Sequence, residues 1–576
     1  MKNKIYILFI VIVGFCITSC NDDFFDTTSD TDLTTDNYWT STDDYRLVLN
    51  GLYTFYTGHG TKWTQSPICW GDKNSDNLVP DDVYEWAAGI YTVPSSDANY
   101  TYSTVRTINT LLEAADENTA GLTDAELAPY IAEAKFFKAE FYFEKCKRYG
   151  AYVWLDDVLT DDSEELYSAR TPRSVVMDSV LSCINYAIDN LEDNTSNNSY
   201  INRNIALAAK SRMMLYEGTY RKYHNEGNYT ECLQEAYDAA LELMESGNYS
   251  LESDYATLFG QIDKTESSEA IMIKNYDYDL LTTSTNYGLA INIPYESVSR
   301  SMVNSYLCSD GLPISQSSLY DESGGWTTVF NNRDPRLSAS VAGPGSEILD
   351  GKYPNIEGAY VNATETPDIQ NVLYIAPTGY VMVKHYQENS YDYNLAQKGA
   401  LDAIIYRYGE VLLNYAEAAC ELGILTQDDV DKSINLLRER VGMPDMIIAD
   451  LVKDEDSDFP DISATLDEIR RERRVELAFE NFRHDDLMRW AAGDLLANRL
   501  LGMKLCDSSG DILSAYNGVY DNVEIGSDIY VDSDGYIWPY ASDLPDGRTF
   551  SDKFYLYPLP TDQLTLNKNL TQNPGW

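Results

Sequence analysis

The sequence has few positive charges for its length. Its 576 residues include 42 Lys and Arg against 92 Asp and Glu, so its formal net charge is −50. Such a charge repels the phosphates of nucleic acid and argues against nucleic acid as a partner. It also repels anionic ligands over a Debye length of about 8–10 Å, which favours a neutral ligand or one held at close range.

The chain also lacks the patterns of a disulfide framework, a metal site or a common catalytic motif. Beyond Cys16 and Cys20 its cysteines are widely scattered, form no CxxC pair and are odd in number. The four histidines are too dispersed for a zinc site of the HExxH kind. Neither a GxSxG elbow nor a phosphate-binding loop is present. We therefore expect no cofactor, no metal and no catalytic residue.

The one long apolar run lies at the start of the chain. Lys2 and Lys4 precede an apolar stretch from Ile5 to Ile17, which is shorter than the ~20 residues needed to span a bilayer. A basic flank, a short apolar core and small residues are typical of a cleaved export signal. We predict that residues 1–19 are this signal peptide.

A cysteine follows directly at the expected cleavage point. Ile17-Thr18-Ser19-Cys20 resembles a bacterial lipobox, in which the cysteine thiol receives a diacylglycerol and the freed amine is then acylated. Several acyl chains, such as palmitate, anchor a protein stably to a membrane. The sequence thus predicts a lipoprotein attached through Cys20, with residues 20–35 as its tether.

Helical periodicity dominates much of the remaining chain. Apolar residues recur at helical spacing, and the helices come in pairs with small residues where they would cross. This favours a mostly α fold, a tetratricopeptide-like superhelix of stacked helical hairpins. No linker divides the chain, and we distinguish a helical region at 36–245, an irregular region with short strands at 246–400 and a second helical region at 401–576.

The second helical region contains a strongly basic segment. Arg470, Arg471, Arg473 and Arg474 alternate there with glutamates, and Thr465 with Glu468 has the spacing of a capping box. In so acidic a chain these arginines need no anionic ligand. We expect a solvated or internally paired cluster rather than an anion site.

Several motifs, in order, carry a family resemblance from Cys20 to Trp576. They are Asn37-Tyr38-Trp39, Asn50-Gly51-Leu52-Tyr53, Gly71-Asp72, Ala134-Lys135-Phe136-Phe137, Asp310-Gly311-Leu312-Pro313-Ile314, Asn332-Arg333-Asp334-Pro335-Arg336-Leu337, Arg407-Tyr408-Gly409-Glu410, Phe482-Arg483-His484-Asp485-Asp486-Leu487 and Asn573-Pro574-Gly575-Trp576. Through them the chain resembles the SusD/RagB family, lipoproteins of Bacteroidetes that sit on outer-membrane transporters.

The resemblance implies a function. It implies a lipid-anchored protein of the cell outer membrane, facing outward, that binds an oligosaccharide and delivers it to a SusC-like TonB-dependent transporter without catalysis. One departure concerns the ligand: family members often carry a tryptophan four residues before the tyrosine that matches Tyr102, and here that residue is Ala98. Peptide capture, glycoside hydrolysis and a scaffold that binds only protein remain alternatives.

Aromatic residues in irregular segments are the candidates for ligand contact. Sugar rings stack their C–H faces on Trp and Tyr, and sugar hydroxyls bind polar side chains such as Asn. A single aromatic residue more often packs in a core, so the grouping is better evidence than any member. The candidates are Trp70, Trp86, Tyr91, Asn99, Tyr100, Tyr276, Tyr278, Tyr287 and Trp326.

Overall fold

The computed structural model describes residues 38–60, 66–69, 71–80, 82–277, 279–280, 296–343, 377–385, 399–516 and 523–576. The export signal, Cys20 and the tether lie outside these residues, as do Trp70, Tyr278 and Tyr287. No described helix is both long enough and apolar enough to cross a membrane.

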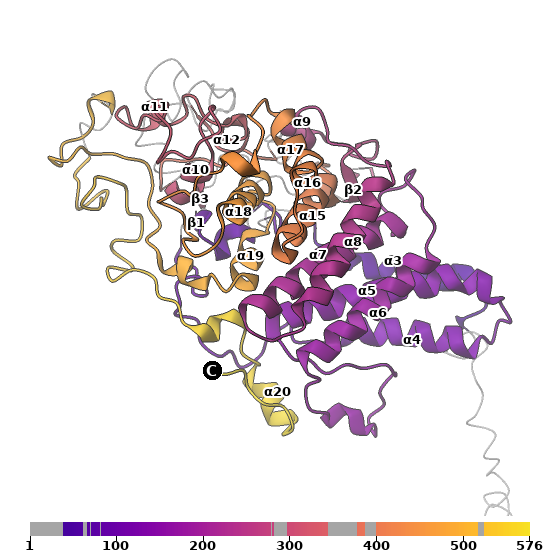
Figure 1. The fold of residues 1–576 in the computed structure, drawn as a ribbon. Helices are drawn as coiled ribbons and strands as arrows, with labels where there is room; N and C mark the ends of the chain where they lie inside the picture. The colour runs from indigo at the N-terminus through magenta and orange to yellow at the C-terminus, as the bar shows by residue number, and fades with distance from the viewer. Residues whose placement is uncertain are drawn as a thin grey trace, which may run out of the picture.

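Stacked helical hairpins form one body of the protein, as the sequence predicts (Figure 1). Helix α5 packs on α6, α6 on α7, α7 on α8 and α8 on α15, so neighbours in space are mostly neighbours in sequence. The helices of this body are α3 (Thr42–Leu52), α4 (Ser103–Glu117), α5 (Asp124–Tyr149), α6 (Arg173–Asn190), α7 (Arg203–Tyr223), α8 (Tyr229–Glu245) and α15 (Tyr408–Leu422). The mostly α, tetratricopeptide-like fold is confirmed.

Helix α5 shows why these segments become helical and where they end. Thr123 caps its first turn in a reciprocal capping box with Glu126. Phe136 and Phe137 are consecutive and both at most 1% exposed, as expected of a helix that is apolar on two faces. The helix stops at Gly150, whose φ of 72° and close approach to Leu556 leave no room for a Cβ.

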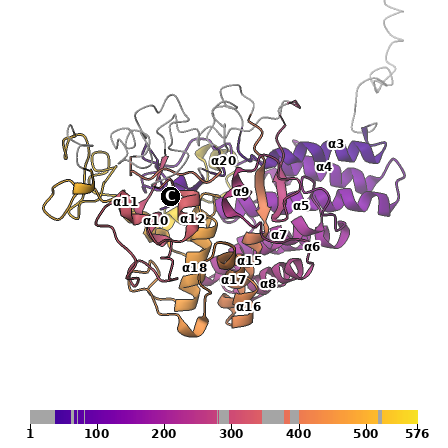
Figure 2. The same ribbon diagram turned by 90° about the horizontal axis from the view of Figure 1, so that it is seen from above.

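Shorter elements form the remainder of the protein. Figures 1 and 2 both place α10, α11 and α12 far from α3 and α4. The helices here are α9 (Tyr255–Gly260), α10 (Arg300–Ser305), α11 (Trp326–Val329), α12 (Pro335–Ser340), α16 (Gln427–Asp431), α17 (Ile434–Arg440), α18 (Ala464–Glu476), α19 (Arg483–Arg489) and α20 (Thr561–Leu566). Short 3₁₀ turns η3 (Gly71–Asn74) and η4 (Glu164–Tyr167) matter for the cavities below.

Two short antiparallel strand pairs connect distant parts of the chain. Strand β1 (Leu78–Pro80) pairs with β3 (Glu296–Val298), and Leu78 lies opposite Val298. Strand β2 (Ala270–Lys274) pairs with β4 (Ala403–Arg407) through an irregular register. Each pair joins an early segment to a later one, so the helical body and the irregular region share backbone hydrogen bonds.

Ion pairs, as well as apolar contacts, fill the interior around α18 in the second half of the chain. Glu476 at the end of α18 accepts hydrogen bonds from Arg336 (2.9 Å), Arg407 (2.8 Å) and Arg440 (2.6 Å), and it is 0% exposed. Burial alone would raise the pKa of this carboxyl, but the three guanidiniums hold it well below its usual range.

The predicted pairing of the α18 arginines is confirmed, but the predicted cap is wrong. Arg473 binds Asp486 at 2.9 Å, and Arg471 binds Asp454 at 2.7 Å. The side chain that caps α18 is Ser463, which accepts from the amide of Leu466, so Thr465 lies inside the helix. Ser463 precedes the helix in extended conformation, which an N-cap requires.

Candidate functional site

A cavity of about 480 Å³ opens between the start of α4, the η4 loop and α20. Figure 1 shows η4 beside α20 near the lower edge of the molecule. We call this the tyrosine cavity, and its principal lining residues are Tyr100, Tyr102, Val105, Leu155, Tyr167 and Leu566. Three stretches far apart in sequence therefore form one wall.

The tyrosines at the base of this cavity are held in place by other tyrosines. Tyr102 stacks on Tyr152, with ring centroids 4.9 Å apart and an angle of 25° between the planes. Tyr100 meets the ring of Tyr149 edge-on at 5.2 Å. Tyr149 ends α5 and Tyr152 follows it, and both are 0% exposed. The cavity base is thus anchored to the longest helix of the body.

The base offers ring surface rather than hydroxyl groups. The hydroxyls of Tyr100 and Tyr102 are buried and make no well-formed hydrogen bond within the described part of the chain. Burial raises the pKa of both phenols, so they stay protonated at neutral pH. A ligand in the cavity would meet the flat, apolar part of these side chains.

The loop that closes one side is fixed by polar side chains from α4. The amide of Asn109 donates to the carbonyls of Leu155 and Asp157, each at 3.1 Å. Arg106 donates to the carbonyl of Leu159 at 2.7 Å. Because these bonds hold residues 155–159, the loop is a defined wall.

The mouth of the cavity combines exposed apolar and polar groups. Leu166, Tyr167 and Leu566 are 43%, 58% and 69% exposed. Exposed apolar side chains gathered at a cavity mark a binding surface more often than scattered ones do. Glu165 and Gln563 stand beside them and supply hydrogen-bonding groups. An apolar base with a polar rim suits a ligand that has both kinds of surface.

Tyr100 is the one described candidate that lines this cavity. Trp86 is 3% exposed and stacks on Tyr557, with ring centroids 3.5 Å apart and an angle of 2° between the planes, and Tyr91 meets it edge-on. The C-terminal Trp576 stacks on the other side at 5.9 Å. This aromatic group fastens the end of the chain to residues 86–91.

Asn99, Tyr276 and Trp326 lie in three other places. Asn99 is exposed, and both its amide groups donate to Asp97. The hydroxyl of Tyr276 donates to the Thr57 carbonyl, and its residue is 7% exposed. Trp326 is also 7% exposed and packs in a hydrophobic core separate from that of the helical body. The structure thus separates these candidates, and their role in ligand contact stays a prediction.

The sequence reading missed most of the tyrosine cavity. Tyr102 could have been found, because it forms a Tyr-x-Tyr pair with Tyr100 directly before a helix. Tyr167 carried no signal beyond its place in a polar loop. Gln563 and Leu566 reach the cavity only through the fold, since they are more than 450 residues from Tyr100.

Asn99 lines a second cavity of about 470 Å³, which contains a buried carboxyl. Burial raises the pKa of Glu140 to about 7, and the Tyr406 hydroxyl donates to it. No three His, Cys, Asp or Glu side chains within the described ranges are grouped so that they could hold a metal ion.

Comparisons with known proteins identify the family. The model of the SusD family matches residues 268–576, more than half of the chain. The chain belongs to the SusD family. The resemblance drawn from its motifs is confirmed.

Relatives match almost the whole chain at low identity. SusD-like protein P2 of Formosa agariphila is 22% identical over 572 residues, which cover 96% of this chain and 94% of that protein. A SusD-like carbohydrate binding protein from Bacteroides fragilis has a similar structure, with a TM-score of 0.69, 20% identity and coverage of 93% of this chain and 100% of that one. Surface glycan-binding protein A from Bacteroides fluxus gives a TM-score of 0.59 at 18% identity, covering 93% and 100% of the two chains. Both structures share the fold of this protein.

Proposed function

We propose that this SusD-family protein binds an oligosaccharide in the tyrosine cavity and passes it to a SusC-like TonB-dependent transporter. The observation that carries the proposal is the cavity itself, with tyrosine rings at its base and polar groups at its rim. Similar structures described as carbohydrate binding and surface glycan-binding support the ligand class.

The binding mode follows from the chemistry of the wall. A sugar ring has apolar C–H faces, which would pack on the rings of Tyr102 and Tyr167. Its hydroxyls point outward from these faces and would meet Glu165, Gln563 and Arg106 at the mouth. The net charge of −50 favours a neutral glycan at this site, because long-range repulsion opposes a polyanion.

The protein acts by binding and does not break bonds. We further propose that Cys20 carries the lipid anchor that holds it on the outer face of the outer membrane. Replacement of Cys20 by Ala should abolish acylation and release the protein from the membrane fraction. Continued acylation of Cys20→Ala would contradict the anchor.

Calorimetric titration of the purified protein with neutral oligosaccharides tests the ligand class, with release of reducing ends measured in parallel. We expect saturable binding without turnover. Binding of peptides but not glycans would instead favour peptide capture, and silence across the panel would favour a scaffold that binds only protein.

Glu140 is an observation that favours a hydrolase, because a carboxyl with a pKa of about 7 can donate a proton at neutral pH. A glycosidase also needs a second carboxylate at a set distance. If the protein were a hydrolase of this kind, turnover would be present and Glu140→Gln would abolish it. We expect no turnover in either form.

A further inference from the structure

A third cavity, of about 400 Å³, has a different chemistry from the tyrosine cavity. It lies between the segment after η3, helices α10, α18 and α19, and residues 454–459 and 498–500. Seven arginines and five aspartates line it, and we call it the arginine pocket. Such a gathering of guanidiniums is unexpected in a chain with a net charge of −50.

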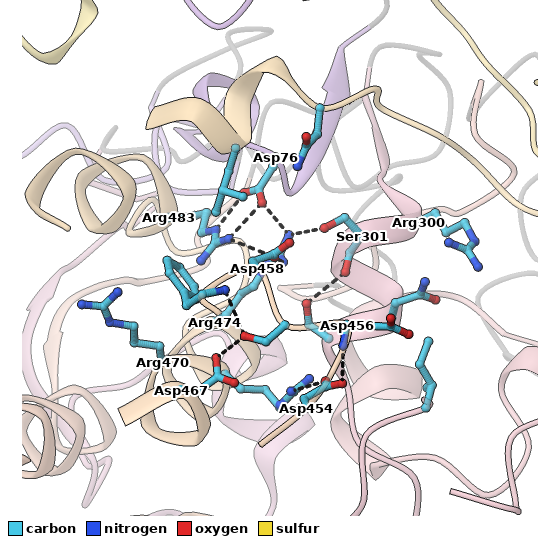
Figure 3. A pocket seen from close by; sticks show the side chains of 18 of the residues that line it. Asp76, Arg300, Ser301, Asp454, Asp456, Asp458, Asp467, Arg470, Arg474 and Arg483 are labelled. Atoms are coloured by element: carbon cyan, nitrogen blue, oxygen red, sulfur yellow. Dashed lines mark hydrogen bonds and ion pairs between the residues drawn. The ribbon is translucent and has the colours of Figure 1, made fainter. Parts of the chain in front are cut away.

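Two arginines share one buried carboxylate on the wall of this pocket. Arg483 donates to the two oxygens of Asp76 at 2.7 and 2.9 Å, and Arg474 donates to one of them at 3.1 Å. Figure 3 shows both guanidiniums converging on Asp76 and on the more exposed Asp458. Asp458 is only loosely held, at 3.4 Å from Arg474 and 4.0 Å from Arg483.

Asp76 stabilises the charge of Arg483 more than that of Arg474, since this carboxylate raises the pKa of Arg483 despite burial. Burial, followed by repulsion from Arg483, lowers the pKa of Arg474 to about 10. Arg474 therefore remains charged at neutral pH, beside a second charge of the same sign. An additional negative group would relieve this repulsion.

Arg548 and Arg499 add two further guanidiniums. Arg548 is 7% exposed and donates to the carbonyls of Asn498 and Ser75, with no carboxylate in ion-pair contact within the described residues. Arg499 is exposed and lies over the ring of Trp538 at 4.3 Å, again without a described carboxylate partner. Asp76 attracts this guanidinium without forming an ion pair with it, and a buried guanidinium that lacks an ion-pair partner is costly, which makes Arg548 a candidate for anion contact.

The remaining charges of the pocket are already paired or lie at its edge. Arg471 binds Asp454 at 2.7 Å, and Lys453 binds Asp467 at 2.9 Å. In Figure 3, Asp454, Asp456 and Asp467 lie together, apart from Asp76. Asp454 and Asp467 are therefore paired with their own cations, whereas Asp458 contacts the guanidiniums around Asp76.

The two arginines at the ends of the pocket are also already paired. Arg300 meets Glu322 at 3.3 Å and the Tyr536 hydroxyl at 2.9 Å. Arg470 meets Glu421 at 3.3 Å. Arg499 and Arg548 thus lack an ion-pair partner among the described residues, and they lie beside Arg474 and Arg483, which share Asp76 and Asp458.

We infer that the arginine pocket binds a single oxyanion, a carboxylate or a sulfate ester, carried by a sugar-sized ligand. Guanidiniums suit both groups, because their planar array of N–H donors matches two oxygens at once. Ser301 and Asn304 also line the pocket and supply neutral polar contacts. A ligand with one negative charge meets these arginines at close range, whereas a polyanion meets the repulsion of the whole chain.

Three monosaccharides separate the sources of the oxyanion: D-galacturonic acid, D-galactose 6-sulfate and D-galactose. Titrations use the purified protein carrying Tyr102→Ala, so that the contribution of the tyrosine cavity is reduced. We expect one or both charged sugars to bind at least about tenfold more tightly than galactose. The charged sugars that bind show whether the pocket accepts a carboxylate, a sulfate ester or both. Equal binding of all three, or no binding of either charged sugar at millimolar concentration, would overturn the inference.

Two variants at accessible positions tie the binding to this pocket. Arg499→Gln removes an exposed guanidinium, and Asn304→Asp adds a negative charge to the wall without removing an ion pair. Each should weaken binding of the charged sugar about tenfold. Arg203→Gln is the matched control, because Arg203 is partly exposed, pairs with Glu242 and lines none of the three cavities.

Unchanged binding in both Arg499→Gln and Asn304→Asp would contradict the site. Circular dichroism of the variants confirms that they are folded. This test is independent of the proposed glycan function. Absence of neutral-glycan binding alone would contradict the proposal for the tyrosine cavity, and absence of oxyanion binding alone would contradict the proposal for the arginine pocket.

Discussion

Aromatic stacking is prominent in the helical body and buried ion pairs are prominent around α18, although the body also buries the Arg173–Glu217 pair, and each cavity takes the character of its surroundings. In the body, rings pack on rings, as Tyr102 does on Tyr152 and Tyr142 on Trp154. Around α18, buried carboxylates and guanidiniums alternate, as at Glu476. The tyrosine cavity borders the first and is apolar, whereas the arginine pocket borders the second and is charged. One fold therefore carries two cavities of different chemistry.

Removal of one central carboxylate gives the largest expected effect. Glu476→Gln leaves Arg336, Arg407 and Arg440 without their shared anion in a site of 0% exposure. We expect the free energy of unfolding to fall by about 3–5 kcal/mol, as when a buried ion pair loses one partner. Urea denaturation measures it.

Glu439→Gln provides the matched control, because Glu439 is exposed on α17. Its expected change is within about 0.5 kcal/mol. Equal effects of the two variants would show that the charge network does not stabilise the second half.

A fall in pH should destabilise the folded protein at the contact between His59 and His385. His59 and His385 face each other at 5.5 Å between ring centroids. Burial, followed by repulsion from Lys384, lowers the pKa of His385 to about 3 from an ordinary value of 6.5. A lowered folded pKa means that the stability is present above pH 6.5 and is lost as the pH falls towards 3.

The loss between pH 6.5 and 5 is about 2 kcal/mol for one such histidine. His385→Asn should therefore show a shallower decline of unfolding free energy over this range than the parent protein. Asn suits the position because His385 has a φ of 67°, which Asn adopts more readily than most residues. Parallel pH profiles for the two proteins would contradict the assignment.

A change of shape in the aromatic body should have the smallest effect on stability. Phe136→Leu keeps an apolar side chain at a position of 0% exposure and leaves no charge unpaired. We expect a loss of about 1 kcal/mol, measured by urea denaturation under the same conditions as for Glu476→Gln. A loss as large as that of Glu476→Gln would remove the contrast between the two halves.

The sequence predicted element types and the family better than it predicted the sites. Periodicity identified the paired helices, because a buried helix repeats its apolar residues locally. The cap of α18 was misplaced by two residues, since Ser463 and Thr465 both suit a cap and only the backbone conformation separates them. The boundaries at residues 245 and 400 stay predictions.

The sites depend on contacts that no local pattern reveals. Trp86 is of a residue type on which sugar rings stack, but its ring packs against Tyr557 and Trp576 from the other end of the chain. Arg474 was expected to be solvated or paired within the protein, without a named partner, and its partner Asp76 lies 398 residues away. Tyr100 was a candidate as an aromatic residue in an irregular segment, whereas Leu155, Tyr167 and Leu566 reach the same cavity from distant segments.

A pair of variants at Tyr102 tests the central claim, that ring surface in the tyrosine cavity binds a glycan. The ring lines the cavity and the hydroxyl is buried, so Tyr102→Phe should bind the oligosaccharide found by titration within about twofold of the parent. Tyr102→Ala removes the ring and should weaken binding at least about tenfold, or about 1.4 kcal/mol. Equal affinities of the Phe and Ala variants for that oligosaccharide would contradict the account.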